Sequence, residues 1–358
     1  SAATAYMRVY MLGMFFSFCF NSLVSVLRGL GDSKTQLYYL VGANVLNALL
    51  SYLFVVCLDY SLVSTAWASV ISQLLAFVLL WIKIQRTNIY MKVRPLPKYF
   101  DLSYFKEIVR IGLPTGIQQS VVSLSQILIL GLVSAFGTGA LAAYSAASRI
   151  ESVAMIFVLN FSTALTTFVG QNFGAGEKLR VRKGLFFSLK MMLALSIVTF
   201  VVFFFGGKVL LGLFSDSEVV SSVGGSYLFI AGAFWFLFAE MNVFTSFFRG
   251  VGFTFVPMVV SVAVLLVVRL PLSYVLSLSY GTDGIWYGAP LSWFIGVVIY
   301  LVCYAKSHWE RRKPLKAVLS VLVVLCFMGG GKVMSQDFCS DYLSPLNIKL
   351  SSSGHFGE

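Results

Sequence analysis

Charged side chains are scarce in this sequence. Only 11% of its 358 residues are Asp, Glu, Lys or Arg, and 58% are hydrophobic, whereas about a quarter of a soluble domain is charged. So little polar surface cannot cover a globule in water, which excludes an ordinary soluble domain. The formal net charge is +12, but the basic residues lie between apolar runs rather than on one face, which argues against a nucleic-acid partner.

Residues suited to metal binding and catalysis are also few. Both histidines lie outside the apolar runs, and the five cysteines lack metal or disulfide spacing. The phosphate-binding pattern G-x-x-x-x-G-K-[ST] is absent, and no Ser/His/Asp or Cys/His constellation is supported. We therefore expect neither an enzyme nor a bound cofactor or metal.

Long apolar runs are what the sequence has in abundance. A membrane-spanning helix needs about 20 mostly apolar residues. Nine segments qualify, at 6–27, 36–58, 61–82, 109–136, 140–170, 185–214, 220–247, 255–279 and 284–305. Because backbone groups in lipid must bond within their own segment, these runs are expected to be helices. The predicted fold class is an all-α polytopic membrane protein.

Basic residues mark alternate links between these segments. Lys and Arg occur in the links 28–35, 83–110 and 171–184, at Arg249 and after residue 305. The intervening links carry acidic residues or no charge. The positive-inside rule then places the C-terminus in the cytoplasm and the beginning of this chain outside. If the complete protein begins in the cytoplasm, an outside start predicts that an odd number of helices is missing upstream.

The link 83–110 and the tail 317–358 are the most polar parts. The link contains the amphipathic stretch YFDLSYFKEIVRIG, which is either a surface loop or, as we prefer, part of a linker with an interfacial helix. In the tail, residues 317–328 are apolar but too few to span. The Ser-rich and Gly-rich end is typical of a loop.

Two stretches repeat one another. SVLRGLGD begins at Ser25 and SFFRGVGF begins at Ser246, so that Arg28 pairs with Arg249, and L-S-Y follows in each copy about two dozen residues later. Both copies have the same predicted orientation, which indicates a parallel repeat of the kind found in secondary transporters. The second half shows six helices and the first shows three, so symmetry suggests three missing helices.

Several separated motifs resemble one family. YMRVYMLGMFF with NSLVSVLRGLGDSKTQL, then IGLPTGIQQSV, then GTGALAAYSAASRIESVAMIFVLNFSTALTTFVGQNFGAGE are similar, in this order, to the bacterial multidrug and toxic compound extrusion (MATE) transporters. The resemblance covers about residues 5–310 of an N-terminally truncated member. It implies a fold of twelve helices in two bundles, about nine of them present. It also implies a monomeric H+- or Na+-coupled antiporter of the bacterial inner membrane that exports amphipathic, often cationic compounds.

This resemblance sets the predicted organisation. Residues 1–84 form the second half of the N-terminal bundle (helices four to six), and 85–108 form a cytoplasmic linker with an interfacial helix. Residues 109–306 form the six-helix C-terminal bundle, and 307–358 form a cytoplasmic tail.

The family's first cation site is altered here. It uses an Asp on the first helix, which this chain lacks, together with an Asn and an Asp one turn apart on the fifth helix. The Asn corresponds to Asn47, but Ser51 occupies the Asp position and cannot carry a charge near neutral pH. We keep both as candidates for cation coupling.

Three ionisable residues inside the spans are further candidates, because such groups are costly in a membrane and usually functional. Glu151 lies in SRIES, Glu240 lies in FLFAEMNVF, and Arg269 lies in VVRLPLSY. Arg149 is a poor partner for Glu151, since positions two apart do not face each other on a helix. Arg269 is expected to neutralise one of the carboxylates or to bind carbonyl groups. The alternative for each carboxylate is a structural contact between helices.

Polar residues recur at helical spacing in the span 109–136. Gln119, Ser123 and Gln126 lie there, and Asn160 lies in the next span. They either line a substrate cavity or join neighbouring helices by hydrogen bonds.

Two rival functions remain open. A lipid-linked saccharide flippase shares the broader fold, but its pyrophosphate would favour a cavity ringed by Arg and Lys, and the basic residues here are mostly in cytoplasmic links. A non-transporting truncated remnant is the second rival, favoured by Ser51 and by the incomplete first bundle.

Overall fold

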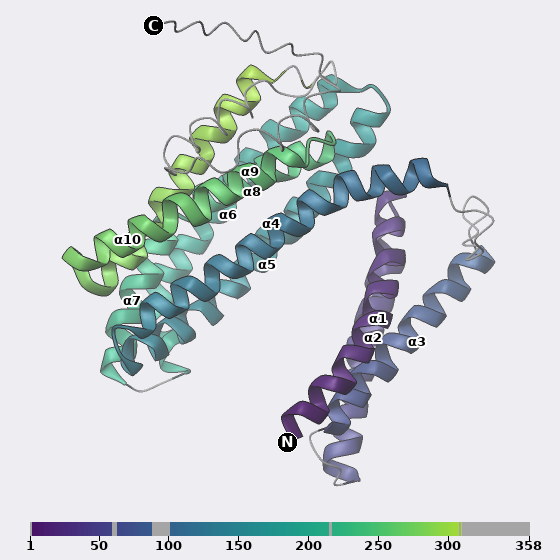
Figure 1. Cartoon of the computed structure of the whole chain (residues 1–358), viewed down its shortest axis with the longest axis horizontal. Helices are drawn as coiled ribbons and strands as arrows, with labels where there is room; N and C mark the ends of the chain where they lie inside the picture. The colour runs from purple at the N-terminus through teal and green to yellow at the C-terminus, as the bar shows by residue number, and fades with distance from the viewer. Residues whose placement is uncertain (1, 59–62, 88–100, 215–216, 308, 310–358) are drawn as a thin grey trace, which may run out of the picture. The chain divides into compact units, whose positions relative to one another are not determined.

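Every element in the described part of the chain is a helix. The computed structural model describes residues 2–58, 63–87, 101–214, 217–307 and 309 (Figure 1). In chain order the elements are α1 (Ala2–Gly29), α2 (Ser33–Tyr52), the π-helix η1 (Leu53–Cys57), α3 (Val63–Thr87), α4 (Leu102–Ser134), α5 (Thr138–Gly174), α6 (Lys178–Gly212), α7 (Glu218–Ala233), α8 (Trp235–Gly250), α9 (Phe255–Val262), the π-helix η3 (Ala263–Arg269) and α10 (Leu270–Lys306). The predicted all-α class is confirmed.

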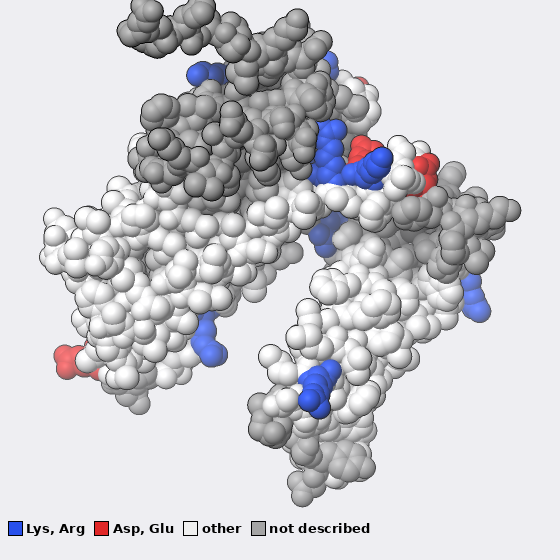
Figure 2. Space-filling model, viewed as in Figure 1, with Lys and Arg blue, Asp and Glu red and all other residues white. Residues whose placement is uncertain are grey.

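The helices have the length and surface that a lipid environment requires. Seven helical stretches of the described residues are long and apolar enough to cross a membrane, and a bent pair adds an eighth. Large apolar side chains face outward; Leu213 is 77% exposed and Phe205 is 76% exposed. Most of the described surface in Figure 2 carries no charge. So extensive an apolar surface is stable only in lipid, and the prediction of a multi-pass membrane protein is confirmed.

The bent pair corresponds to the predicted span 220–247. Helices α7 and α8 meet at an angle of 51°. Phe234 separates them, with φ −110° and ψ 13°, outside the helical region. The residues on both sides return to helical geometry, so one span is broken rather than ended.

The 52 residues from Phe255 to Lys306 contain the two predicted spans 255–279 and 284–305, and the chain leaves helical geometry at Gly281, in the short link that we expected between them. A straight helix of that length would measure about 78 Å, more than twice the hydrocarbon thickness. The chain instead reverses at Gly281, whose φ of 60° and ψ of −136° suit only glycine. Ser273 Oγ donates to the carbonyl of Ile285 at 3.3 Å. The two halves therefore lie side by side and cross the membrane separately.

Glycine makes this hairpin close. A Cβ atom at Gly288 would lie 2.0 Å from Ser273 Oγ, and one at Gly284 would lie 2.2 Å from the carbonyl oxygen of Leu276. Both distances are far below van der Waals contact, so only glycine allows the two halves to approach this closely.

The chain divides into two compact units. One comprises Ser1–Arg110 with Thr166–Glu177, and the other comprises Ile111–Leu165 with Lys178–Glu358. The end of α5 thus groups with the first unit, although our predicted boundaries assign it to the C-terminal bundle. The core of the first unit joins α1, α2 and α3 and contains Phe20, Leu23, Val24, Leu27, Ala43, Ala76, Leu80 and Ile84. The core of the second unit contains residues of α4, α5, α6, α7 and α10.

Two links predicted on the same side of the membrane meet within the first unit. Gln171 Nε2, near the end of α5, donates to the carbonyl of Gly29 at 2.9 Å. These residues adjoin the basic links 28–35 and 171–184. The contact agrees with our prediction that both links lie on the same side of the membrane, and that this side is the cytoplasm stays a prediction.

The repeated R-G-x-G motifs adopt the same local structure. Gly31 and Gly252 both have φ of +87°. After them, the amide of Asp32 donates to the carbonyl of Leu27 at 3.0 Å, and the amide of Phe253 donates to the carbonyl of Phe248 at 2.8 Å. This is the glycine C-cap in which a residue in the left-handed region lets the chain leave the helix. The two motifs therefore end α1 and α8 in the same way.

The predicted interfacial helix is continuous with the next span. Helix α4 begins at Leu102, so the described part of the amphipathic stretch forms its first turns. Asp101 Oδ1 accepts a hydrogen bond from the amide of Ser103 at 2.7 Å at this helix start. Whether these turns lie at the interface stays a prediction. Residues 88–100 of the link, and the tail apart from Ser307 and Trp309, lie outside the described residues.

We expect Gly288→Ala to destabilise the protein, because the added methyl group would force the hairpin apart. Overpacking of this kind costs about 1–3 kcal/mol, and scanning fluorimetry of the purified protein should show a lower Tm. Gly225→Ala in α7 is the matched control, since no atom lies within 4 Å of its Cβ position. An unchanged Tm for Gly288→Ala would contradict the close approach.

Candidate functional site

Glu151 forms the centre of a polar cluster in the second unit. It lies on α5, 13 residues after Thr138, which is about 20 Å along the helix, and its side chain is partly buried. The hydroxyl of Tyr227, from α7, donates a hydrogen bond to Glu151 Oε2. Tyr227 itself is only 5% exposed. A carboxylate is therefore held at membrane depth by a buried hydroxyl from another helix.

Three aromatic rings, Tyr227 among them, pack against one another in this cluster. Tyr144 stacks on Trp286 with ring centroids 5.4 Å apart and planes 9° from parallel. Tyr227 meets both rings edge to face, at 5.5 Å from Tyr144 and 4.9 Å from Trp286. Aromatic faces with a carboxylate beside them attract organic cations by their quadrupoles and by charge.

Arg269 supplies the positive charge of the cluster. It ends η3 and lies close enough to Glu151 and Tyr144 for a charge interaction. Pro271 follows within α10, and since proline lacks an amide hydrogen the helix cannot keep its regular bonds there. This accounts for a π-helical segment immediately before it. That Arg269 neutralises a carboxylate or binds carbonyl groups stays a prediction.

The cluster contains buried polar atoms without partners. Among the described residues, Arg269 Nε and Trp286 Nε1 are both buried and have no hydrogen-bond partner. A buried donor without a partner costs about 1–3 kcal/mol. Both atoms belong to residues that contact or face the Glu151 cluster, so the cluster has unused donors for a further ligand or water.

Helix packing explains why these residues meet. Tyr144 and Glu151 are seven residues apart and therefore lie on one face of α5. On α7, a Cβ at Gly224 would lie 3.0 Å from Leu211 and 3.4 Å from the carbonyl oxygen of Ala143. Glycine at this position lets α7 lie close to α5. Tyr227 follows one turn later on the same face and so reaches Glu151.

The candidates of the first unit form a neutral contact. Asn47 Nδ2 donates to Ser69 Oγ at 3.0 Å, and Ser72 Oγ lies 3.4 Å away. These bonds join α2 to α3. Ser51 lies one turn later on α2 and is partly buried. The arrangement offers amide and hydroxyl oxygens, and no carboxylate takes part in these bonds.

The other predicted site residues lie apart from the Glu151 cluster or face outward. Glu240 is partly buried on α8. Gln119, Ser123 and Gln126 are exposed on α4, on the face that does not pack within the second unit. Asn160 is exposed on α5, and its Nδ2 donates to its own helix at Ile156, 2.8 Å away. Their role as cavity lining stays a prediction.

A second polar network lies at the repeated motif of the second unit. Gln118 Nε2 donates to Ser261 Oγ at 2.8 Å, while Arg249 Nη2 donates to Gln118 Oε1 at 2.7 Å. The network joins α4, α8 and α9. Gln118 is buried, so it is the glutamine next to our candidate Gln119 that connects these helices.

Tyr144, Tyr227 and Trp286 were missed by the sequence analysis. The spacing of Tyr144 and Glu151 on one helix face was a usable signal. Tyr227 and Trp286 are 76 and 135 residues from Glu151 in the chain. No local pattern marks residues that only helix packing brings together.

Long apolar helices in two units, with a carboxylate and an arginine embedded in one of them, define a polytopic α-helical membrane protein. The chain belongs to the MatE family, whose family model matches residues 1–53 and 114–275. The predicted family is thereby confirmed.

Relatives and solved structures agree with this family. The chain is 27% identical to the probable multidrug resistance protein YpnP of Bacillus subtilis, over 87% of this chain and 69% of that protein. It is 25% identical to the probable multidrug resistance protein NorM of Thermotoga maritima, over 88% and 69%. A crystal structure of the MATE transporter VcmN of Vibrio cholerae matches with a TM-score of 0.79 at 20% identity, over 86% of this chain and 70% of that one. The last match confirms the MATE-like fold.

We expect Tyr227→Phe to lower the stability of the second unit, because it removes the donor to Glu151. A hydrogen bond to a charged group contributes about 1.5–3 kcal/mol, so the Tm measured by scanning fluorimetry should fall by several degrees. Tyr280→Phe is the control, since Tyr280 is 65% exposed and should leave the Tm unchanged. Equal Tm values for the two variants would show that the bond to Glu151 contributes nothing.

Proposed function

We propose that this chain functions in a cation-coupled antiporter that exports amphipathic, often cationic compounds, with H+ or Na+ as the coupling ion. The observation that carries the proposal is the Glu151 cluster, in which a carboxylate accepts a hydrogen bond from Tyr227, which packs against an aromatic pair, while Arg269 lies within range of a charge interaction. The proposal is supported by family membership and by relatives that are named as probable multidrug resistance proteins. We place the protein in a bacterial inner membrane, as a monomer with its C-terminus in the cytoplasm.

Competition for one carboxylate would provide the coupling. When Glu151 is ionised, it can hold an organic cation against the rings of Tyr144 and Trp286. A proton or Na+ at the same carboxylate would remove the charge that retains the cargo. For transport, the outward-open and inward-open states must differ in affinity for each ligand. Two units that move against each other would supply these states by alternating access.

The neutral site in the first unit has a smaller role in this proposal. Asn47 and Ser51 can bind Na+ through oxygen atoms, but neither can take up a proton near neutral pH. Glu240 is the second carboxylate available within the spans. We therefore assign coupling first to Glu151 and second to Glu240.

The decisive variant is Glu151→Gln, which keeps the size of the side chain and removes its charge and its proton uptake. In cells that lack their own efflux pumps, ethidium efflux driven by a pH or sodium gradient should fall at least tenfold. Glu177→Gln is the matched control, because Glu177 is an exposed carboxylate just before α6, and should retain full efflux. Gradient-driven efflux that survives in Glu151→Gln would overturn the role of this carboxylate.

An anionic cargo is a second candidate, favoured by one observation. Arg269 Nε is buried and without a partner among the described residues, and a guanidinium is suited to phosphate or carboxylate groups. The FAD transporter of Shewanella oneidensis is 23% identical to this chain, over 81% of this chain and 64% of that protein. Efflux of a flavin nucleotide that is lost in Arg269→Gln, with ethidium efflux absent, would favour this candidate over cation export.

A further inference from the structure

The beginning of α6 carries a cluster of positive charge on its outer face. Between residues 171 and 190 the basic residues are Lys178, Arg180, Arg182, Lys183 and Lys190, and Glu177 is the only acidic residue. One face of this segment is buried, through Val181, Leu185 and Ser188. The opposite face is exposed and contains Arg182 and Lys183.

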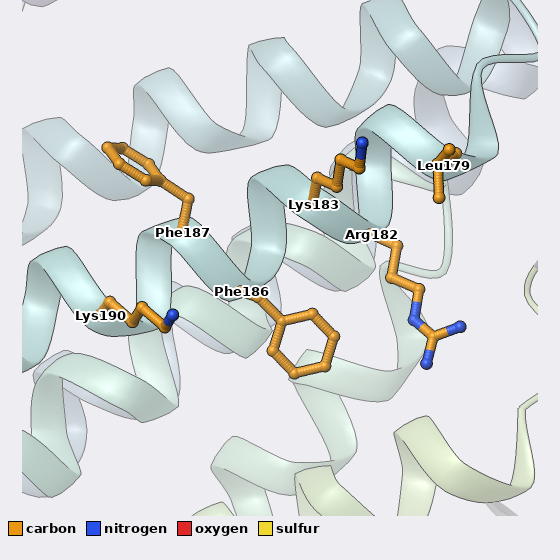
Figure 3. Close-up of a pocket in the computed structure, with 6 residues that line it drawn as sticks. All are labelled: Leu179, Arg182, Lys183, Phe186, Phe187 and Lys190. Carbon is orange, nitrogen blue, oxygen red and sulfur yellow. The ribbon is translucent and has the colours of Figure 1, made fainter.

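The exposed face contains an open hollow of about 380 Å³. Its lining consists of Leu179, Arg182, Lys183, Phe186, Phe187 and Lys190. Figure 3 shows that Arg182 and Phe186 extend to one side of the helix while Lys183 and Phe187 extend to the other. In each pair the phenylalanine follows the basic residue by four positions, one helical turn away. Cationic groups and aromatic rings therefore alternate along the hollow.

The two aromatic side chains of this hollow are exposed. Phe187 is 62% exposed and Phe186 is 47% exposed. Exposed phenylalanines next to lysine and arginine suit a surface where water and lipid meet, because the rings remain in an apolar phase while the charged groups reach polar headgroups.

The position of the hollow along α6 also indicates that it lies where water and lipid meet. Lys190 and Lys208 are 18 residues apart with no charged residue between them, a rise of about 27 Å along the helix. This is close to the hydrocarbon thickness of about 30 Å. The two lysines thus mark the two edges of the hydrocarbon, and the hollow, which extends from Leu179 to Lys190, lies at the headgroup level of the leaflet that we predict to be cytoplasmic.

We propose that this hollow binds the headgroup of an anionic phospholipid, with the phosphate held by Arg182, Lys183 and Lys190 and the upper acyl chain lying against Phe186 and Phe187. Three cationic side chains and no acidic one line the hollow in the described structure, so its charge complements a phosphate. Bidentate contact with Arg182 and point contacts with the lysines are the usual means of holding phosphate groups. The depth along α6 favours a lipid over a soluble anion.

A bound anionic lipid would explain how the charge of Lys190 is compensated. Lys190 lies on the exposed face at the edge of the apolar part of α6, where an uncompensated charge is costly. A phosphate at the hollow would compensate it and would fix the depth of α6 in the membrane. The inference concerns a surface that the proposed transport cycle does not use, so it stands independently of that proposal.

The test is a lipid titration of the purified full chain in non-ionic detergent, followed by native mass spectrometry. Phosphatidylglycerol is the probe, and phosphatidylcholine is the neutral-lipid comparison. In the double variant Arg182→Gln with Lys183→Gln, the Kd for phosphatidylglycerol should rise about tenfold, whereas the weaker binding of phosphatidylcholine should not change. Inorganic phosphate at the same concentration should not displace the lipid, because it has no chain to lie against the phenylalanines.

The matched control is the double variant Lys178→Gln with Arg180→Gln, which removes the same charge from the same helix end outside the hollow. Its Kd should change less than twofold. An equal rise in both double variants would mean diffuse attraction and would overturn the site, as would displacement by inorganic phosphate. If the first double variant misfolds, Lys190→Gln alone should weaken phosphatidylglycerol binding several-fold, and unchanged binding would refute the proposal.

Discussion

The absence of water in the hydrocarbon determines most of this structure. Backbone groups there have no partner except each other, so every described element is a helix. Buried hydroxyls follow the same requirement. The Ser196 hydroxyl donates to the carbonyl of Met192 at 2.7 Å, and the Ser292 hydroxyl donates to the carbonyl of Ala289 at 2.6 Å, each within its own helix. Most polar groups in the spans are thus satisfied locally and add little to recognition between helices.

In the Glu151 cluster, polar groups are paired across helices and only in part. The bond from Tyr227 joins α7 to α5, while Arg269 Nε and Trp286 Nε1 lack partners among the described residues. Leaving buried donors unpaired costs free energy, and sites that keep such a cost are frequently functional. The close packing that glycine allows at Gly224 maintains this arrangement. A transporter needs groups that can exchange partners, and a fully satisfied core would not offer them.

Hydropathy and loop charge predicted the spans and the family because both depend on local composition. Glu151 and Arg269 were found in the same way, as charges inside apolar runs. Three things were not accessible. The reversal near Gly281 was predicted, but the close packing of its two halves at Gly288 and Ser273 was not, since no local pattern pairs these residues. Tyr227 and Trp286 reach Glu151 only through helix packing. Gln118 and Gln119 are adjacent, and only the rotation of α4 decides that the first is buried and the second exposed.

The repeat shows that shared backbone structure does not imply shared chemistry. Arg28 and Arg249 precede the same glycine cap, yet Arg28 Nε donates to Gln36 Oε1 within the next helix, at 3.1 Å, whereas Arg249 reaches Gln118 from a distant part of the chain. The polar contacts of the spans differ in the same sense, since Asn47 meets serine hydroxyls while Glu151 lies near a tyrosine and an arginine. A neutral contact can stabilise a bundle but cannot respond to a proton. Among the described residues, the first unit thus joins its helices here by a neutral contact, whereas the second unit holds an ionisable group inside its spans.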